Sequence, residues 1–81
     1  MDEERHLGRT IRDLRERRKL NQTELAEGAG VSLLTSSRIV RGEHDPHLKT
    51  LARLSAVLGV SIVDLLRSSG YSEVGDIDPE G

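Results

Sequence analysis

The sequence predicts a single all-α domain of five short helices. Three observations support this fold class. Apolar residues recur three or four positions apart, which is the spacing of one helical face. Glycine, proline and helix-capping residues separate these apolar stretches, as they do where helices begin and end. No stretch alternates apolar and polar residues as a half-buried strand does, and 81 residues suit one small domain.

The first two helices are expected in the N-terminal part of the chain. The first covers residues 4–19, and apolar residues at i, i+4 and i+7 form its inner face: Leu7, Ile11 and Leu14. Asn21 and Glu24 have the spacing of a capping box, in which each side chain accepts a hydrogen bond from the other residue's backbone N–H. They predict the start of a second helix, which is short because Gly28 and Gly30 weaken it and then end it.

The remaining three helices are predicted from capping residues and helix breakers. Ser32 is the expected N-cap of a third helix over residues 32–42. Pro46 interrupts the chain after it, because proline disfavours a helical conformation in the residue before it. A fourth helix is expected over residues 48–58 and a fifth over about 61–67. The inner face of the fourth helix consists of Leu51, Leu54 and Leu58.

The charge of the chain is unevenly distributed. All twelve Lys and Arg residues lie within residues 5–67, together with seven Asp and Glu residues, so this part has a net charge of +5. Residues 1–4 carry −3 and residues 68–81 carry −4. A basic body suits a polyanionic partner, because Lys and Arg bind phosphates whatever the sequence of the nucleic acid. Residues 68–81 are small, polar and acidic, and they are predicted to be a disordered tail or linker.

The composition also predicts the compartment. The chain has no cysteine, which fits a reducing cytoplasm because disulfides are typical of oxidising compartments. No apolar run approaches the length of a membrane-spanning helix, and the acidic start MDEER is unlike a secretory signal. We therefore expect a cytoplasmic protein with no membrane partner.

A tight turn with two glycines, residues 28–32, joins the second and third helices. A helix-turn-helix has this arrangement, with its second helix placed in the major groove of DNA. Around this turn the sequence resembles the Cro/repressor-like (XRE-type) helix-turn-helix domains. The resemblance covers residues 7–66, and the predicted domain is 7–67 with its motif at about 22–41. The matching residues include Leu7-Gly8, Leu20-Asn21-Gln22, Gly30-Val31-Ser32, Ser37-Arg38-Ile39 and Leu58-Gly59-Val60-Ser61.

The resemblance implies a compact five-helix lambda-repressor-like domain that binds double-stranded DNA sequence-specifically as a transcriptional regulator. A homodimer on a near-palindromic operator is expected, and a repressor rather than an activator, because nothing resembles an activation segment. By family pattern, the residues expected to contact DNA are Gln22, Thr23, Ser32, Leu33, Leu34, Ser37, Arg38 and Arg41. Those expected to form the dimer interface are Ile62, Leu65 and Leu66.

The sequence departs from the family pattern on the third helix. Leu33 and Leu34 stand where many relatives carry polar residues, so base recognition there would be apolar, against thymine methyl groups. Ser36 stands where relatives usually bury an aliphatic residue. Val40 replaces a common glutamate that pairs in relatives with the arginine matching Arg15. Arg15 must then contact another acid, a phosphate or water.

Two residue clusters resemble catalytic or metal sites only superficially. Glu43-His44-Asp45-Pro46-His47 has two imidazoles and two carboxylates, but their spacing matches no structural zinc motif. The hydroxyls of residues 35–37 lack the base and orienting acid that activate a nucleophile. We therefore expect no catalytic residue, no metal and no other cofactor.

Two alternatives remain open. Leu33 and Leu34 would also suit an apolar patch for a protein partner such as an antirepressor. The chain would equally suit the N-terminal DNA-binding domain of a longer sensor-regulator, with residues 68–81 as the start of a linker.

Overall fold

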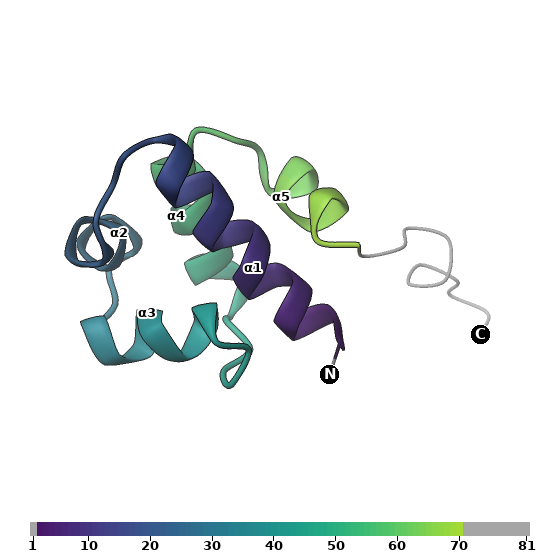
Figure 1. Ribbon diagram of the computed structural model, residues 1–81, viewed down its shortest axis with the longest axis horizontal. Coiled ribbons are helices and arrows are strands. Elements are labelled where there is room, and N and C mark those ends of the chain that lie inside the picture. Colours follow the sequence, from purple (N-terminus) through teal and green to yellow (C-terminus); the bar gives the residue numbers. More distant parts are fainter. Residues whose placement is uncertain (1, 71–81) are drawn as a thin grey trace.

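The computed structural model describes residues 2–70. Its five helices are α1 (Asp2–Arg17), α2 (Gln22–Ala29), α3 (Leu33–Val40), α4 (Leu48–Leu58) and α5 (Ile62–Ser68). These residues include no strand, so the all-α prediction is confirmed. Figure 1 shows α1 crossing in front of α4, with α3 below them and α5 on the side away from α2. None of the five helices is long and apolar enough to cross a membrane.

The core is entirely aliphatic and receives side chains from every helix. The inner-face residues predicted for α1 and α4 are mostly buried, although Leu14 and Leu51 lie at the edge of the core and are only half-buried. Full burial of one such side chain is worth about 1.5–3 kcal/mol, so a few residues supply most of the stabilisation. The buried hydrophobic residues are Leu7, Ile11, Leu25, Ala26, Ala29, Ile39, Leu54, Leu58 and Leu65.

Gly8 lets the backbone of α1 touch the last turn of α3. A Cβ atom at this position would overlap the carbonyl oxygen of Val40 and lie 2.8 Å from that of Ile39. The obstacle is main chain, which cannot rotate out of the way as a side chain can. Glycine at residue 8 therefore sets how closely α3 is held against α1.

Gly28 has a comparable role between α2 and α4. A Cβ there would overlap a methyl group of Val57. The sequence suggested only that this glycine weakens the helix, but α2 continues through it to Ala29. Its missing side chain makes room for α4.

The end of α1 has an unusual backbone conformation. Lys19 has a φ of 59°, in the left-handed region where helices commonly place a glycine. The backbone N–H of Leu20 donates to the Arg15 carbonyl at 3.1 Å. Arg15 in turn donates from Nη1 to the Leu20 carbonyl at 2.7 Å and lies 3.7 Å from the Glu16 carboxylate. Arg15 thus contacts a backbone carbonyl and a neighbouring acid, and it stabilises the turn into α2.

We expect Lys19→Gly to raise the free energy of unfolding by about 1 kcal/mol, because a left-handed conformation costs a residue with a Cβ roughly that much. For a domain of this size the melting temperature should rise by about 4–8 °C. Lys19→Ala is the matched control, since it removes the charge and keeps the Cβ. If thermal unfolding shows an equal gain for both variants, the charge of Lys19 and not its backbone conformation is responsible.

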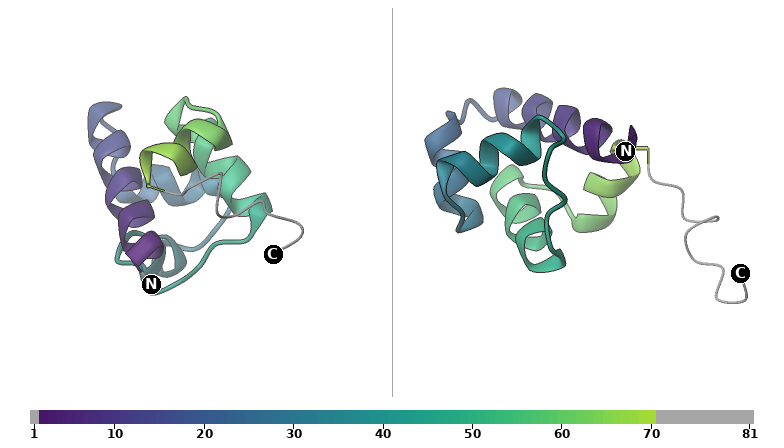
Figure 2. Two further views of the ribbon diagram at one scale, coloured as in Figure 1. Left: turned by 90° about the vertical axis from the view of Figure 1, so that its right-hand side faces the viewer. Right: turned by 90° about the horizontal axis from the view of Figure 1, so that it is seen from below.

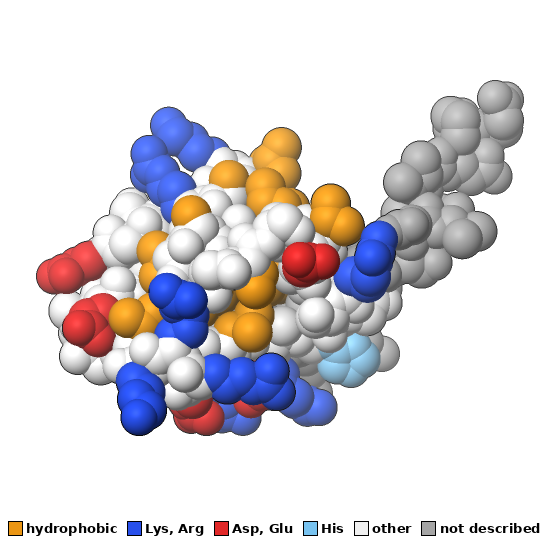
Figure 3. Space-filling model, turned by 90° about the horizontal axis from the view of Figure 1, so that it is seen from above, with side chains coloured by type: hydrophobic (Ala, Val, Ile, Leu, Met, Phe, Trp, Pro, Cys, Tyr) orange, Lys and Arg blue, Asp and Glu red, His pale blue; other side chains and the backbone are white. Residues whose placement is uncertain are grey.

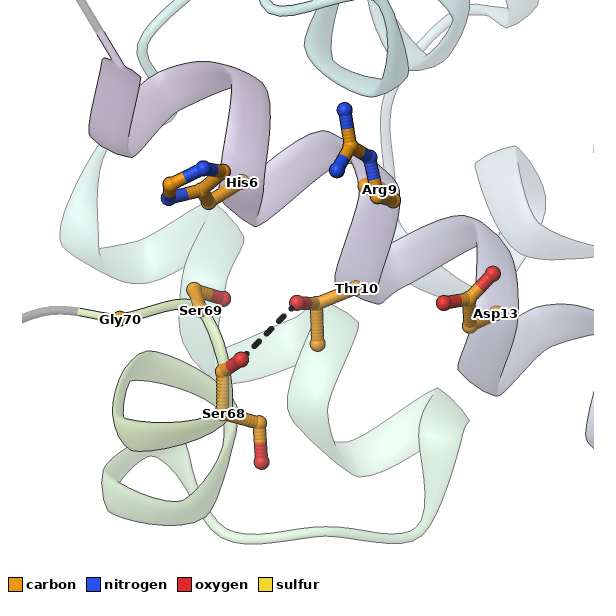
Figure 4. A pocket seen from close by; sticks show the side chains of 7 residues that line it. All are labelled: His6, Arg9, Thr10, Asp13, Ser68, Ser69 and Gly70. Atoms are coloured by element: carbon orange, nitrogen blue, oxygen red, sulfur yellow. Dashed lines mark hydrogen bonds between the residues drawn. The ribbon is translucent and has the colours of Figure 1, made fainter.

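The fold extends slightly beyond the predicted domain boundary. Residues 68–81 were predicted as a tail, yet Ser68 belongs to α5 and Ser69 is buried. The Ser69 hydroxyl donates to a carbonyl oxygen of α5 at 2.7 Å, which satisfies its only donor inside the protein. Thr10 Oγ1 of α1 donates to the Ser68 carbonyl at 3.3 Å (Figure 4). The remainder of the predicted tail, residues 71–81, lies outside the described residues.

Candidate nucleic-acid interface

Helices α2 and α3 are joined by a turn of three residues. Gly30 has a φ of 72°, and its N–H donates to carbonyl oxygens of the last turn of α2. The N–H of Val31 also turns back, donating to the Ala26 carbonyl at 3.1 Å. Ser32 then begins α3, with its hydroxyl accepting from the Thr35 N–H at 3.0 Å. The turn is therefore closed by hydrogen bonds at both ends and fixes α3 relative to α2.

The start of α2 has the predicted capping box. The Asn21 N–H donates to Glu24 Oε1 at 2.8 Å, and the Glu24 N–H donates to Asn21 Oδ1 at 2.7 Å. Gln22 and Thr23 are exposed in this first turn. Their backbone N–H groups have no acceptor within the helix, because the first turn of an α-helix leaves them unpaired. Such a helix start favours an anion.

Helix α3 has a clear inner and outer face. Ser36 and Ile39 are buried, whereas Leu33 is 49% exposed and Leu34 is 58% exposed. Both leucines therefore point away from the core, although they are large and apolar. Arg38 is exposed on the same side of α3, one helical turn after Leu34. Seen from below, α3 lies in front of α1 and no other described helix covers it (Figure 2, right).

Some of the polar side chains predicted to bind DNA already form hydrogen bonds or an ion pair within the protein, and others do not. Ser32 is exposed, but its hydroxyl caps α3 and also donates to Thr35 Oγ1 at 3.0 Å. Ser37 is half-buried. Arg41 lies 3.4 Å from the Glu43 carboxylate, and both side chains are more than half exposed. Within residues 2–70 Arg38 forms no ion pair, so its charge is available to a partner.

A family model for helix-turn-helix domains matches residues 11–65. The chain belongs to the helix-turn-helix family. This match covers all of α2–α5 except the end of α5, together with most of the core. It agrees with the XRE-type resemblance of the sequence.

The relatives of this helix-turn-helix chain include two proteins whose names or sources refer to a phage. It is 42% identical over 59 residues to the Cryptic phage CTXphi transcriptional repressor RstR of Vibrio cholerae, which covers 73% of this chain and 53% of RstR. It is 34% identical over 72 residues to the ImmF control region 10 kDa protein of Bacillus phage phi105, which covers 80% of each. The chain thus spans about half the length of RstR.

The fold also matches the crystal structure of a gene regulator. The clp gene regulator ClgR from Corynebacterium glutamicum gives a TM-score of 0.80 at 30% sequence identity. The match covers 86% of this chain and 73% of the ClgR chain.

Two arginines that were not predicted join the outer face of this helix-turn-helix domain. Arg9 and Arg12 of α1 line a cleft of about 280 Å³ together with Val40 and Arg41 at the end of α3. Their i, i+3 spacing shows that they share a face of α1. The sequence does not show that this face lies beside α3, because that depends on how the two helices cross.

The predicted dimer residues occupy different positions on α5. Ile62 and Leu66 are half-buried, but Leu65 is 0% exposed and packs in the core of its own chain. Leu65 therefore has no surface for a partner, and the exposed apolar residue of α5 is Val63, at 55%. Figure 3 shows the side of the molecule opposite α3, where hydrophobic side chains run across the surface among Lys and Arg.

The histidine-containing loop after α3 has no arrangement typical of a metal site. In the part of the chain that the structure describes, no three His, Cys, Asp or Glu side chains lie close enough to share one metal ion. The loop continues from Glu43, which pairs with Arg41, to the exposed His47 that precedes α4. Between them, Pro46 is buried.

Proposed function

We propose that this chain is a sequence-specific double-stranded DNA-binding transcriptional regulator, and that it acts as a repressor. The observation that carries the proposal is the outer face of α3, the second helix of the helix-turn-helix, which exposes two leucines and two arginines. The relatives named above as repressors and regulators support it. The proposed action is binding in the cytoplasm, without a catalytic step, a metal or another cofactor.

The dimensions of α3 suit the major groove. Its eight residues give a helix length of about 12 Å, close to the width of the groove at about 12 Å. The N-terminal residues of such a helix contact base edges. Leu33 and Leu34 would then lie deepest, with Ser37, Arg38 and Arg41 further along. Gln22, Thr23 and Ser32 would lie against the backbone, where the start of α2 offers N–H groups to a phosphate.

The experiment that tests the proposal is selection of binding sites from a random duplex pool, repeated at two salt concentrations. A sequence-specific regulator should enrich one motif at both, because base contacts persist while the phosphate contribution weakens with salt. Enrichment of no motif at the higher salt concentration would contradict sequence-specific recognition.

We further propose a homodimer that uses the apolar surface of α5, formed by Ile62, Val63 and Leu66. A twofold dimer would bind a near-palindrome whose half-sites lie about 34 Å apart, one helical turn of DNA. Analytical sedimentation of the DNA complex should find two chains on each selected site. A single chain on each high-affinity site would contradict the dimer.

Leu33 and Leu34 are proposed to recognise a thymine methyl group, the one apolar group that the major groove offers. Burying one methyl is worth about 0.8 kcal/mol, so replacing the contacted thymine by uracil should weaken binding about fourfold. Binding measured by fluorescence anisotropy to duplexes with single thymine-to-uracil changes tests this prediction.

The double variant Leu33→Ala, Leu34→Ala provides the control for methyl recognition. This variant should bind both duplexes more weakly than the wild type does, but replacing thymine by uracil should hardly change its affinity. General damage to α3 would instead weaken binding to both duplexes alike. An equal uracil effect in both proteins would show that the leucines do not contact DNA, and an apolar surface for a protein partner such as an antirepressor would explain them better.

A further inference from the structure

A cleft lined by arginine lies between α1 and the end of α3. Arg9 and Arg12 contribute from α1 and Arg41 from the C-cap of α3, around a volume of about 280 Å³. Val40 also lines the cleft, and none of the lining side chains among the described residues is acidic. We refer to this site as the arginine cleft.

The positive charge of the arginine cleft is poorly balanced by the protein itself. Arg9 and Arg12 are exposed, and neither forms an ion pair with the side chains that the structure describes, those of residues 6–70. Arg41 pairs with Glu43 at 3.4 Å, but both side chains are more than half exposed, and such surface pairs contribute little. Three arginines that line one cleft with so little compensation favour an anion there. The planar fork of a guanidinium group can donate to two oxygens of one phosphate, whereas a spherical ion offers no such pair of acceptors.

The position of the cleft indicates which phosphate it meets. Arg41 belongs both to the cleft and to the outer face of α3, so the two surfaces are continuous. If α3 lies across the major groove, its C-terminal end meets the wall of the groove, and that wall is a phosphate backbone. Gly8 holds α1 directly against this end of α3, which places Arg9 and Arg12 at the same wall.

We propose that the arginine cleft binds a backbone phosphate of the DNA that α3 enters. This proposal rests on the proposed function and adds α1 to the DNA-binding surface. The cleft fixes the position of α3 along the groove without recognising a base, because phosphate contacts orient the protein on the duplex but do not distinguish one base sequence from another. Val40 favours this use, since an aliphatic side chain at this position adds no carboxylate to the lining of the cleft.

The experiment compares two double variants that each remove two positive charges from the N-terminal part of the chain. Arg9→Gln, Arg12→Gln removes the α1 side of the cleft. Arg17→Gln, Arg18→Gln is the matched control, because Arg17 ends α1 and Arg18 directly follows it. Arg17 lines a different pocket together with Ser68 of α5, and the Arg18 side chain lies beside Gly59. Binding to the selected operator and to a non-specific duplex of equal length is measured over a range of salt concentrations, with circular dichroism as the check on folding.

The cleft variant should bind both duplexes about tenfold more weakly at low salt, as expected for the loss of a charge-assisted contact. Its dependence on salt should also decrease, by about one unit of logarithmic slope for each lost phosphate contact. The control should change much less. Replacing single phosphates of the operator by neutral methylphosphonates should identify one whose neutralisation weakens the wild type but not the cleft variant.

Two outcomes would overturn the proposal. Equal losses in the cleft variant and the control would show that only overall charge matters. The second outcome combines two results. The DNA affinities of the two variants are equal, and inorganic phosphate saturates the cleft at low millimolar concentration when its binding is monitored by NMR of the arginine side chains. Together these results would indicate a site for a small free anion. If selection finds no operator, that result contradicts only the proposed function. The two variants can still be compared on the non-specific duplex, so the proposal for the cleft remains testable.

Discussion

Gly8→Ala should destabilise the protein by about 2 kcal/mol, although alanine is intrinsically better than glycine in a helix by about 1 kcal/mol. The added Cβ would overlap the main-chain carbonyl of Val40, so α1 and α3 must separate. This separation also loosens the packing of Ile39 in the core. A loss of this size is a large part of the total stability of a small domain, and denaturant unfolding measures it directly.

The control for Gly8→Ala is Gly28→Ala, where the obstacle is a side chain. The new Cβ would meet a methyl group of Val57, and Val57→Ala removes that methyl group. In the Val57→Ala background, Gly28→Ala should therefore cost nothing or even stabilise α2. No side-chain substitution on α3 should rescue Gly8→Ala in this way. Full rescue by a smaller residue at position 40 would contradict the proposed main-chain contact.

The helical pattern of the sequence was sufficient to predict the fold, because it depends on local spacing. Leu7 and Ile11 are buried as predicted, and the capping box of Asn21 and Glu24 forms in both directions. The pattern could not predict which backbones touch. Gly8 therefore gave no signal of its contact with α3, since a glycine within a helical pattern is interpreted first as a weakness of the helix.

Short helices and turns were less predictable than long helices. The seven residues of α5 are too few for their spacing to distinguish one face from the next. The family pattern placed Leu65 in a dimer interface, but its side chain is buried in its own chain, whereas Val63 is exposed. The left-handed conformation at Lys19 had no local signal, because the usual glycine is missing there. Arg15 stabilises that turn through a contact with the Leu20 carbonyl that only the folded chain reveals.

The candidate site was predictable where it lies on one helix and not where it combines two. Neighbouring residues cannot share one inner face, so at least one of Leu33 and Leu34 was expected to face outward, and both are exposed. The arginine cleft combines α1 with the end of α3, and its parts are about thirty residues apart in the sequence. Only the crossing of these helices brings Arg9 and Arg12 to Arg41.

Arg38→Ala should reduce affinity for the selected operator by about 10- to 100-fold, while affinity for a non-specific duplex should fall only a few-fold. Arg38 is exposed near the middle of α3, one turn after Leu34, and no ion pair within residues 2–70 has to break before it binds. In the proposed complex, a side chain at this position would reach the floor of the groove, where arginine can recognise guanine with two hydrogen bonds. Arg41→Ala should reduce specificity less, because Arg41 lies at the C-cap beside the arginine cleft and already pairs with Glu43.

Arg38→Lys separates recognition of a base from attraction to a phosphate. Lysine keeps the charge but lacks the planar fork that binds guanine O6 and N7 together. If Arg38 recognises guanine, most of the specificity should be lost in Arg38→Lys, and affinity for the non-specific duplex should be retained. Thermal unfolding should be unchanged in both variants, because exposed substitutions usually alter stability by no more than about 0.5 kcal/mol. Equal losses on the operator and the non-specific duplex in Arg38→Ala would instead place this arginine on the backbone and leave base recognition to the leucines alone.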